Sequence, residues 1–377
     1  MPGPHTERSI RLRAGLLISG TLDKLTGGNL YDRMLVEHLR ATGHYMRVFS
    51  LPGQTYPSRL LGNFAFSMIE RIKEESLDIL LQDELEHAAL FQLNQRLKKQ
   101  IDCPVVSIVH HLRSAELRPS WQNSLYRMVE RRYLQSVDGF VFNGENTKAS
   151  VHRLCGRQLP MVVAHPGGNR LGADTTEAEI IDRARQPGAI RVLFVGNVIR
   201  RKGLHVLVEA MKQLPVGACT LTIIGSLSLD KRYVREIIQQ IDQNGMGNRV
   251  AILGALSDRE LSGQLKSAHV LAVPSSYEGF GIVYLESRGF GLPAIGSAAG
   301  GAGEIITHEH DGFLLPVDDV HSLARYLNRL HQDRNLLTAM SLNAFQRFQN
   351  HPTWQQTCRK ITAFMESMTT RNGNGSY

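Results

Sequence analysis

The most constraining feature of this sequence is a regular alternation of short β-rich runs with helical segments, repeated along two halves of the chain. In the first half, six runs have the character of strands: AGLLIS, MRVFSL, DILLQD, PVVSIVHH, GFVFNG and PMVVAHP. Six more follow in the second half: RVLFVGN, CTLTIIGS, RVAILGAL, VLAVPS, LPAIGS and GFLLPV. Most of the segments between them space their apolar residues as amphipathic helices do. Strands that alternate with helices form parallel sheets covered on both faces, so the pattern predicts an α/β fold.

Length and patterning together predict two Rossmann-like domains of similar size. The chain has 377 residues, which exceeds what one hydrophobic core usually fills. We expect an N-terminal domain over residues 1–170, a polar linker without a clear strand over 171–188, and a second domain over 189–350. A helix is expected over 351–368, with its return to the first domain left open. The polar, glycine-rich tail 369–377 is expected to be disordered.

Charge and cysteine usage narrow the class of protein. The net charge of +8 permits an anionic partner such as a nucleotide, an acidic membrane surface or nucleic acid, but a mildly basic surface without a partner is an equal alternative. The four cysteines lack the spacing of a metal or redox site, which indicates reduced thiols in a cytoplasmic protein. No apolar run approaches the roughly 20 residues of a membrane span. Nucleic acid ranks last among the partners, because no nucleic-acid module is recognisable.

Two motifs in the first half lie where a predicted strand gives way to a loop. After the first strand the loop carries Gly27 and Gly28, and a helix is expected to begin near Leu30. Glycines there would let an anion approach the free N–H groups of the helix start, although a plain flexible turn has the same pattern. After the fourth strand come His110 and His111, at the strand end that faces a ligand cleft in such sheets. A cleft imidazole could donate to a sugar hydroxyl or a developing charge, and a structural histidine is the alternative.

A basic cluster follows the first strand of the second half. Arg200, Arg201 and Lys202 directly precede a predicted helix, and Lys202 lies at or near the helix start. The helix dipole disfavours a cation at that end, so an anion such as a diphosphate would offset an unfavourable placement. The alternative is a solvated basic loop.

A glycine loop with two glutamates follows the strand HVLAVPSS. The backbone N–H groups of Gly281, Ile282 and Val283 would form an anion site at the start of a helix. Glu278 precedes this loop and Glu286 lies two helical turns further on, so both can border one cleft and accept hydrogen bonds from sugar hydroxyls. The alternative is a capping acid and an exposed helix glutamate. We expect Glu286→Ala to change the stability of the free protein by no more than about 0.5 kcal/mol, as at a surface position.

These stretches resemble a known family. PSSYEGFGIVYLESRGFGLPAIGSAAGGAGEII resembles the E-x7-E signature of the retaining GT-B glycosyltransferases of family 4. VGNVIRRKG resembles their phosphate-contacting loop, TGGNLYDRMLVEHL their first glycine loop, and PVVSIVHH their cleft-histidine strand. The resemblance covers nearly the whole chain in the right order. It implies two Rossmann-like β/α/β domains that face a central cleft, with the acceptor on the first and the donor on the second.

The resemblance also implies roles for single residues. His110, rather than His111, matches the cleft histidine, and Glu278 matches the first glutamate, which lies at the donor sugar; we expect both to act in catalysis. Glu286 matches the second glutamate, which holds the ribose hydroxyls, and Lys202 matches the lysine that neutralises the diphosphate. The further donor-binding positions implied are Gly28, Asn197, Arg201, Leu256, Gly279, Phe280, Gly281, Ile282 and Val283.

One position departs from the family pattern. Asn197 stands where an arginine usually follows the strand glycine, so this position lacks the charge that the family pattern has there. Arg200 or Arg201 is expected to supply the missing charge.

The activity that the resemblance implies is a retaining transfer of a hexose-type sugar. The donor would be a nucleoside diphosphate sugar, with UDP favoured, and the acceptor a hydroxyl of a glycan or lipid-linked substrate in cell-envelope or polysaccharide synthesis. No Asp-x-Asp occurs in the sequence, so we expect neither a metal nor a cofactor beyond the donor. A nucleotide-sugar epimerase and a non-catalytic nucleotide-sugar-binding protein on the same fold are the alternatives.

The segment LRPSWQNSLYRMVERRYLQ has the pattern of a basic amphipathic helix. It places Trp121, Leu125, Met128 and Val129 on one face, with Arg127, Arg131 and Glu130 elsewhere. Such a helix could lie on an anionic bilayer and present a lipid acceptor, while the alternative is a surface helix whose apolar face packs on the sheet. We therefore expect a cytoplasmic protein and leave a peripheral position on the inner face of the membrane open.

Overall fold

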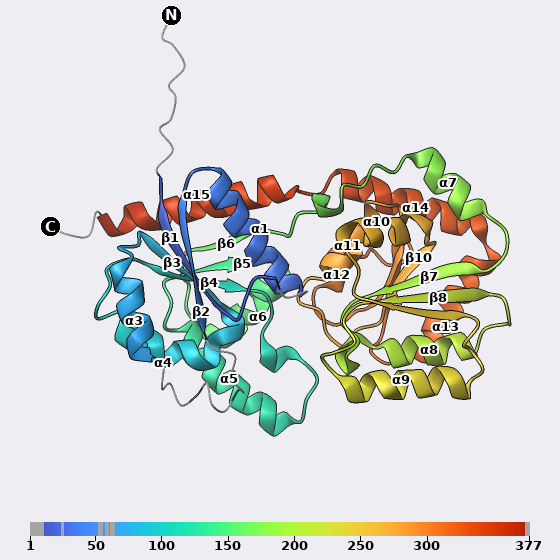
Figure 1. The fold of residues 1–377 in the computed structure, drawn as a ribbon, viewed down its shortest axis with the longest axis horizontal. Helices are drawn as coiled ribbons and strands as arrows, with labels where there is room; N and C mark the ends of the chain where they lie inside the picture. Colours follow the sequence, from blue (N-terminus) through green and yellow to red (C-terminus); the bar gives the residue numbers. More distant parts are fainter. Residues whose placement is uncertain (1–10, 24–25, 52–55, 57–59, 61–64, 374–377) are drawn as a thin grey trace, which may run out of the picture.

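The computed structural model describes residues 11–23, 26–51, 56, 60 and 65–373, which fold into two lobes, each built around a parallel six-stranded sheet (Figure 1). Residues 1–10 of the expected first domain and 374–377 of the expected tail lie outside this part of the chain. The first sheet has the strand order β2-β1-β3-β4-β5-β6. Its strands are β1 (Arg13–Ser19), β2 (Tyr45–Leu51), β3 (Ile79–Asp83), β4 (Val105–Val109), β5 (Gly139–Phe142) and β6 (Met161–Val163).

The second sheet has the strand order β12-β11-β10-β7-β8-β9 and is also parallel. Its strands are β7 (Ile190–Val195), β8 (Cys219–Ile224), β9 (Val250–Gly254), β10 (Val270–Val273), β11 (Ala294–Ser297) and β12 (Gly312–Leu315). Every strand predicted from the sequence is present, and the α/β fold with two Rossmann-like halves is confirmed.

Helices cover both faces of each sheet. In the first lobe they are α1 (Gly27–Ala41), α3 (Ala65–Glu74), α4 (His87–Leu97), α5 (Ser120–Leu134) and α6 (Glu145–Cys155). In the second lobe they are α7 (Glu177–Arg185), α8 (Leu204–Lys212), α9 (Lys231–Gln243), α10 (Asp258–Ser267), α11 (Ile282–Arg288), α12 (Ala302–Ile305), α13 (Val320–Gln332) and α14 (Arg334–Gln349). The last helix is α15 (Trp354–Gly373).

Helix α1 begins at Gly27, about one turn earlier than the start expected near Leu30. The reason is a side-chain cap: Thr26 Oγ1 accepts a hydrogen bond from the backbone N–H of Asn29 at 3.2 Å. Gly28 therefore belongs to the first helical turn and not to a loop.

Much of the expected linker is a helix that belongs to the second lobe. Thr176 and Glu179 form a reciprocal capping box that starts α7. The guanidinium of Arg183 then donates to the backbone carbonyls of Phe290 and Gly291 at 2.7 and 2.9 Å. The acid-rich composition of this segment reflects the solvent face of a packed helix rather than an open connection.

Helix α15 leaves the second lobe and runs along the upper edge of the first lobe (Figure 1). Trp354, Ile361 and Met365 are buried in the same apolar cluster as residues of α1, β1 and β3. The helix continues to Gly373, so residues 369–373 of the expected disordered tail are helical.

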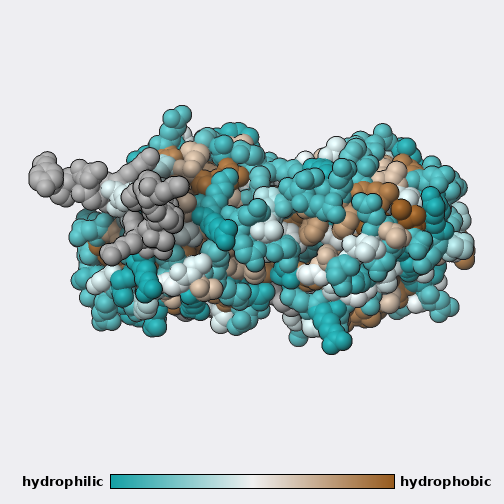
Figure 2. All heavy atoms as spheres, turned by 90° about the horizontal axis from the view of Figure 1, so that it is seen from above, coloured by the Kyte–Doolittle hydropathy of each residue, from teal (hydrophilic) through white to brown (hydrophobic). Residues whose placement is uncertain are grey.

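Direct contacts join the two lobes near their centre. The carboxylate of Glu304 accepts hydrogen bonds from the backbone N–H groups of Glu145 and Asn146, at 2.8 and 2.7 Å, and so caps α6 from the other lobe. The face seen from above is mainly hydrophilic, with small scattered apolar patches (Figure 2). Among the described residues, none of the helices combines the length and apolar character needed to cross a membrane.

Candidate functional site

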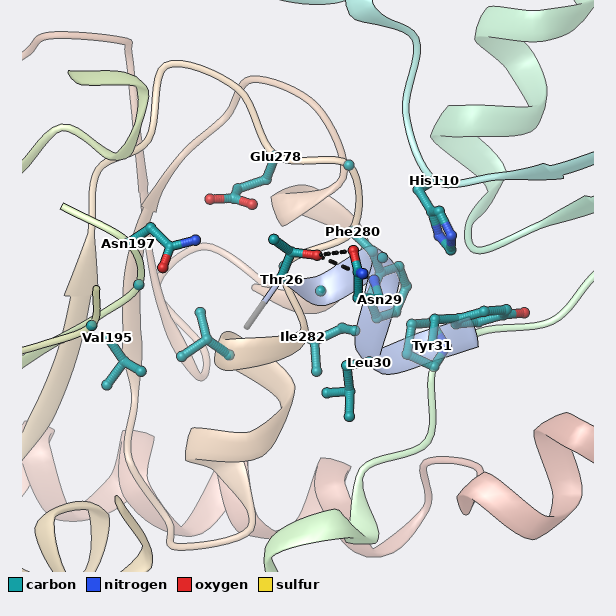
Figure 3. Close-up of a pocket in the computed structure, with 18 of the residues that line it drawn as sticks. Thr26, Asn29, Leu30, Tyr31, His110, Val195, Asn197, Glu278, Phe280 and Ile282 are labelled. Atoms are coloured by element: carbon teal, nitrogen blue, oxygen red, sulfur yellow. Dashed lines mark hydrogen bonds between the residues drawn. The ribbon is translucent and has the colours of Figure 1, made fainter. Parts of the chain in front are cut away.

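A cavity of about 520 Å³ lies between the lobes, at the carboxyl ends of both sheets. The strand order reverses between β1 and β3 in the first sheet and between β7 and β10 in the second. Open α/β sheets bind ligands at such reversal points, because the adjacent loops diverge and leave a crevice. Ser19 and Asp83, the last residues of β1 and β3, line the cavity from one side. Val195, the last residue of β7, lines it from the other (Figure 3).

All the site candidates proposed from the sequence line this one cavity. They come from both lobes and from positions up to 258 residues apart along the chain, from Gly28 in α1 to Glu286 in α11. They are Gly28, His110, Asn197, Arg201, Lys202, Leu256, Glu278, Gly279, Phe280, Gly281, Ile282, Val283 and Glu286.

Glu278 is a buried carboxylate on the wall formed by the second lobe. Lys202 Nζ donates a hydrogen bond to its Oε1 at 2.6 Å, and Ser275 Oγ donates to the same oxygen at 2.5 Å. Burial alone would raise the pKa of Glu278, but the charges of Lys202 and Arg201 outweigh it and lower the pKa to about 2. The carboxylate is therefore ionised at neutral pH.

The same ion pair accounts for the placement of Lys202. This residue closes a 3₁₀ turn (Arg200–Lys202) one residue before the positive-φ Gly203 and the start of α8. A positive charge near the start of a helix is unfavourable, and the carboxylate of Glu278 offsets that unfavourable charge. Arg201 also lines the cavity and donates to the backbone carbonyl of Tyr277 at 2.6 Å, whereas Arg200 pairs with Glu236 on the surface.

Helix α11 points its first turn into the cavity. Its N-cap residue Gly281 has φ +92°, a conformation that side chains disfavour, and a Cβ there would lie 2.5 Å from the ring of Tyr284. The N–H groups of Ile282 and Val283 belong to the first turn, where an α-helix has no internal acceptor for them. Both residues line the cavity, so the site has the partial positive charge predicted from the sequence.

Glu286 is buried and paired, which differs from the exposed helix glutamate considered above. Arg170 Nε donates to Glu286 Oε1 at 2.7 Å, and Arg170 Nη1 also bonds Asp258 Oδ1. Burial raises the pKa of Glu286 more than the guanidinium of Arg170 lowers it. Glu286 is therefore not a surface residue, and the expectation that Glu286→Ala behaves as a surface change is wrong. Removing the Glu286 carboxylate would leave Arg170 with only one of its two carboxylate partners.

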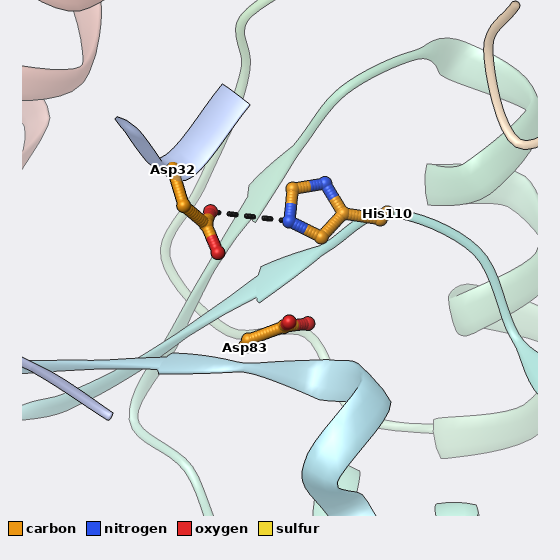
Figure 4. A group of neighbouring side chains, drawn as sticks. All are labelled: Asp32, Asp83 and His110. Atoms are coloured by element: carbon orange, nitrogen blue, oxygen red, sulfur yellow. Dashed lines mark hydrogen bonds and ion pairs between the residues drawn. The ribbon is translucent and has the colours of Figure 1, made fainter. Parts of the chain in front are cut away.

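The wall formed by the first lobe centres on His110. Its Nε2 lies 3.1 Å from Oδ1 of Asp32, and the carboxylate of Asp83 lies beside the same ring (Figure 4). His110 and Asp32 are 4% and 1% exposed, so water screens this pair poorly. Burial alone would lower the pKa of His110, but the charge and hydrogen bond of Asp32 outweigh it and raise the pKa to about 9.

Two glycines allow His110 to occupy this position. A Cβ on Gly28 would lie 3.0 Å from His110 Cδ2, closer than most Cβ atoms come to a neighbour. A Cβ on Gly279, from the other lobe, would lie 2.5 Å from the His110 carbonyl oxygen. The absence of a side chain at these two glycines thus leaves room for His110, in addition to exposing backbone groups to a ligand.

The sequence did not identify Arg170 and Asp258, which line the cavity, or Asp32, which contacts His110 beside it. Asp32 lies on a helix whose other inward positions are apolar, and Arg170 stands at the border of a segment without clear pattern. Each becomes recognisable only through its partner, so no signal within its own stretch could have identified it.

Two groups of described side chains bring carboxylate and imidazole atoms within 4.8 Å of one another: Asp32, Asp83 and His110, and a fully buried set formed by Glu84, His87 and Glu130. In the first group the Nε2 of His110 is already bonded to Asp32. In the second, Glu130 accepts hydrogen bonds from Ser114 through both carboxylate oxygens. The bonds of His110 and Glu130 belong to polar networks within the fold, whereas the two buried carboxylate oxygens of Glu84 have no hydrogen-bond partner among the described residues.

Comparison with known proteins places the chain in a family. Residues 26–169 match the family model described as Glycosyltransferase Family 4, and residues 176–347 match the one described as Glycosyl transferases group 1. A D-inositol 3-phosphate glycosyltransferase of Xylanimonas cellulosilytica is 29% identical over 266 residues, which are 66% of this chain and 63% of the relative. Across three curated relatives, the matched region spans 36% to 63% of the relative's own length.

Solved structures share the fold. The sucrose-phosphate synthase of Thermosynechococcus elongatus is 22% identical, with a TM-score of 0.83 over 96% of this chain and all of that chain. The Anabaena protein HepE, in complex with UDP and glucose, is 20% identical, with a TM-score of 0.76 over 95% of this chain and all of that one. With both family models matched in order along one chain of this architecture, the protein belongs to the family 4 glycosyltransferases and has their two-domain GT-B fold.

Proposed function

We propose that this protein is a retaining glycosyltransferase that moves a hexose-type sugar from a nucleoside diphosphate sugar to an acceptor hydroxyl. The observation that carries the proposal is the composition of one cavity. An ionised carboxylate, two cations and the first turn of α11 line one wall, and the buried imidazole of His110 lines the other. A nucleoside diphosphate sugar fits such a cavity, because its anionic diphosphate can pair with the cations and its sugar hydroxyls can bond the carboxylate.

The diphosphate is assigned to the wall formed by the second lobe. Lys202 and Arg201 supply positive charge there, and the N–H groups of Ile282 and Val283 supply hydrogen-bond donors. In the free protein Lys202 is held by Glu278, so the lysine is in place before the donor arrives. Preformed charge of this kind avoids reorganisation during the reaction.

The sugar and ribose are assigned to the two glutamates. Glu278 is ionised and borders the sugar position, where it accepts hydroxyl hydrogen bonds. Arg170 occupies Oε1 of Glu286, which leaves Oε2 for the ribose hydroxyls. Arg170 thereby acts as a positioning residue for Glu286.

The chemistry requires no protein nucleophile. The bond between the sugar C1 and the diphosphate oxygen breaks while the acceptor oxygen bonds to C1 from the same face. The acceptor proton passes to the departing diphosphate oxygen, and the cationic wall stabilises the charge that develops there. His110, held protonated by Asp32, donates a hydrogen bond to the substrate from the opposite side.

The donor base, the acceptor and the location are finer parts of the same proposal. UDP is favoured because it is the nucleotide bound by HepE, which shares this fold. The acceptor is a glycan or a lipid-linked sugar in cell-envelope or polysaccharide synthesis. We place the protein in the cytoplasm, with peripheral contact to the inner face of an anionic membrane.

A panel of UDP-, GDP-, ADP- and TDP-sugars tests the donor. One nucleotide class should raise the melting temperature, and Glu286→Gln should weaken that shift, whereas Glu236→Gln outside the cavity should not. Nucleotide release with an acceptor and an unchanged anomeric configuration in the product would support retaining transfer. An epimerase would instead interconvert the donor sugar without nucleotide release, and a shift without any turnover would indicate a binding protein.

A further inference from the structure

Helix α5 presents an apolar stripe to solvent in addition to the face that it packs on the sheet. Val129, Tyr133 and Leu134 are buried inward. On the outer side Trp121, Leu125 and Met128 follow one another at helical spacing and are 64%, 51% and 46% exposed. The sequence had grouped Val129 with these three residues, but its side chain belongs to the inner face.

The stripe is a concentration of apolar surface rather than scattered exposure. Leu117, four residues before Trp121, is 67% exposed and extends the stripe beyond the helix start. These four residues are among only nine large apolar side chains that are exposed in the described part of the chain. Clustered exposure of this kind marks a surface that is covered by something in function.

The exposed charges on α5 itself have one sign. Arg127, Arg131 and Arg132 are exposed on α5, and none of them forms an ion pair with another residue in the described part of the chain. The only acid of the helix, Glu130, is fully buried, and its two oxygens accept hydrogen bonds from Ser114. The exposed surface of α5 is therefore apolar and cationic, without a carboxylate.

A hydrogen-bonded segment connects the cavity to the stripe along the chain. His111 lines the cavity, and its Nε2 lies 3.0 Å from Oε1 of Glu116. Arg118 donates to the other oxygen of Glu116 at 2.6 Å, which holds the segment that leads to Leu117 and α5. In Figure 1, α5 forms the lower edge of the first lobe, opposite the edge along which α15 runs.

We propose that the outer face of α5 docks on an anionic lipid bilayer. Trp, Leu and Met side chains enter the interface between headgroups and acyl chains, while the arginines keep their guanidinium groups at the level of the lipid phosphates. A protein partner or a second copy of the chain would need carboxylates opposite three arginines, whereas an anionic bilayer supplies phosphate at any position. Docking would hold the first-lobe wall of the cavity beside the membrane surface.

This inference extends the proposed function, since a docked cavity can receive a lipid-linked acceptor, but its test does not depend on turnover. The full-length protein is floated with vesicles of phosphatidylcholine alone and with vesicles that contain about one third phosphatidylglycerol, at about 0.1 M and about 0.5 M salt. We expect flotation only with the anionic vesicles, and a large decrease at the higher salt.

Matched variants assign the binding to α5. The triple variant Trp121→Ser, Leu125→Ser, Met128→Ser, and separately Arg127→Gln, Arg131→Gln, Arg132→Gln, should each weaken vesicle binding at least about tenfold. Replacing the same three arginines by lysine keeps the charge and should retain binding. Val216→Ser with Leu229→Ser, two exposed apolar positions in the second lobe, should leave it unchanged.

Each other outcome overturns the proposal. Equal flotation with neutral vesicles, no flotation at all, or unaltered binding by both α5 variants would do so. A lipid-independent dimer that the serine variant abolishes would assign the stripe to a second copy. Melting curves recorded with and without a nucleotide sugar report separately on folding and on donor binding. A failure of the proposed donor site can therefore be distinguished from a failure of membrane docking.

Discussion

The Nε2 atom of His110 lies 3.1 Å from the Oδ1 atom of Asp32, and both side chains are buried beside the cavity. The two residues are 78 positions apart, one at a strand end and one in the second turn of α1. A buried imidazole so close to a carboxylate is held in its charged form, which determines how the site responds to pH.

Replacing Asp32 by Asn should flatten the pH dependence of stability. Because the pKa of His110 is raised from 6.5 to about 9, its stabilising contribution is complete below about pH 6.5 and is lost as the pH rises through 9. That contribution is on the order of 3 kcal/mol at most. Denaturant unfolding of both proteins between pH 6 and pH 10 measures it.

The control for this effect is the His110→Gln background. There, Asp32→Asn should produce no pH-dependent difference in the free energy of unfolding. A difference that persists would assign the titration to another group, and Asp83 and Glu84 are the nearest candidates because their charges also act on His110.

Replacing Lys202 by Met should destabilise the free protein as well as abolish the nucleotide-sugar shift. The change leaves the carboxylate of Glu278 buried with a weaker counter-charge, which costs roughly 3 kcal/mol for a broken buried pair. Adding Glu278→Gln should restore much of the free energy of unfolding without restoring donor binding. If the double variant also binds the donor, the pair is structural and the diphosphate assignment fails.

Replacing Glu286 by Ala should lower the free energy of unfolding by about 1–3 kcal/mol, because Arg170 loses its buried acceptor. The same variant should weaken donor binding. Asp258→Asn, which removes the exposed partner of Arg170, should change stability by less than about 1 kcal/mol. Equal losses in the two variants would contradict the central role given to Glu286.

Replacing Gly28 by Ala should lower kcat through a displaced His110, because the new Cβ would lie 3.0 Å from its ring. Gly27→Ala is the matched control, since its Cβ would have only Ile282 Cδ1 nearby, at 3.6 Å. Both variants gain helix propensity in α1, so melting temperatures should not fall in the control. Equal kinetic losses would point instead to a steric effect on the ligand.

The architecture and the location of the site could be predicted from local patterns. Strand and helix periodicity identified all twelve strands, because burial on both faces of a parallel sheet demands continuous apolar runs. The glycine loop around Gly281 and the basic turn at Lys202 each have a physical signature within a few residues. The capping pair that turns the expected linker into α7 was present in the sequence at Thr176 and Glu179, and its significance was missed.

The partners of the site residues were decided only in three dimensions. The sequence indicated that Lys202 needs an anion, but not that Glu278 supplies one at 2.6 Å. It placed Glu286 and His110 in a cleft, but not Arg170 and Asp32 beside them, and it left open which side of α5 faces the sheet. Local composition determines which segments form strands, helices and glycine turns. The ionisation of a group and the exposure of a helix face depend on atoms brought together from distant segments, and those distances exist only in the folded chain.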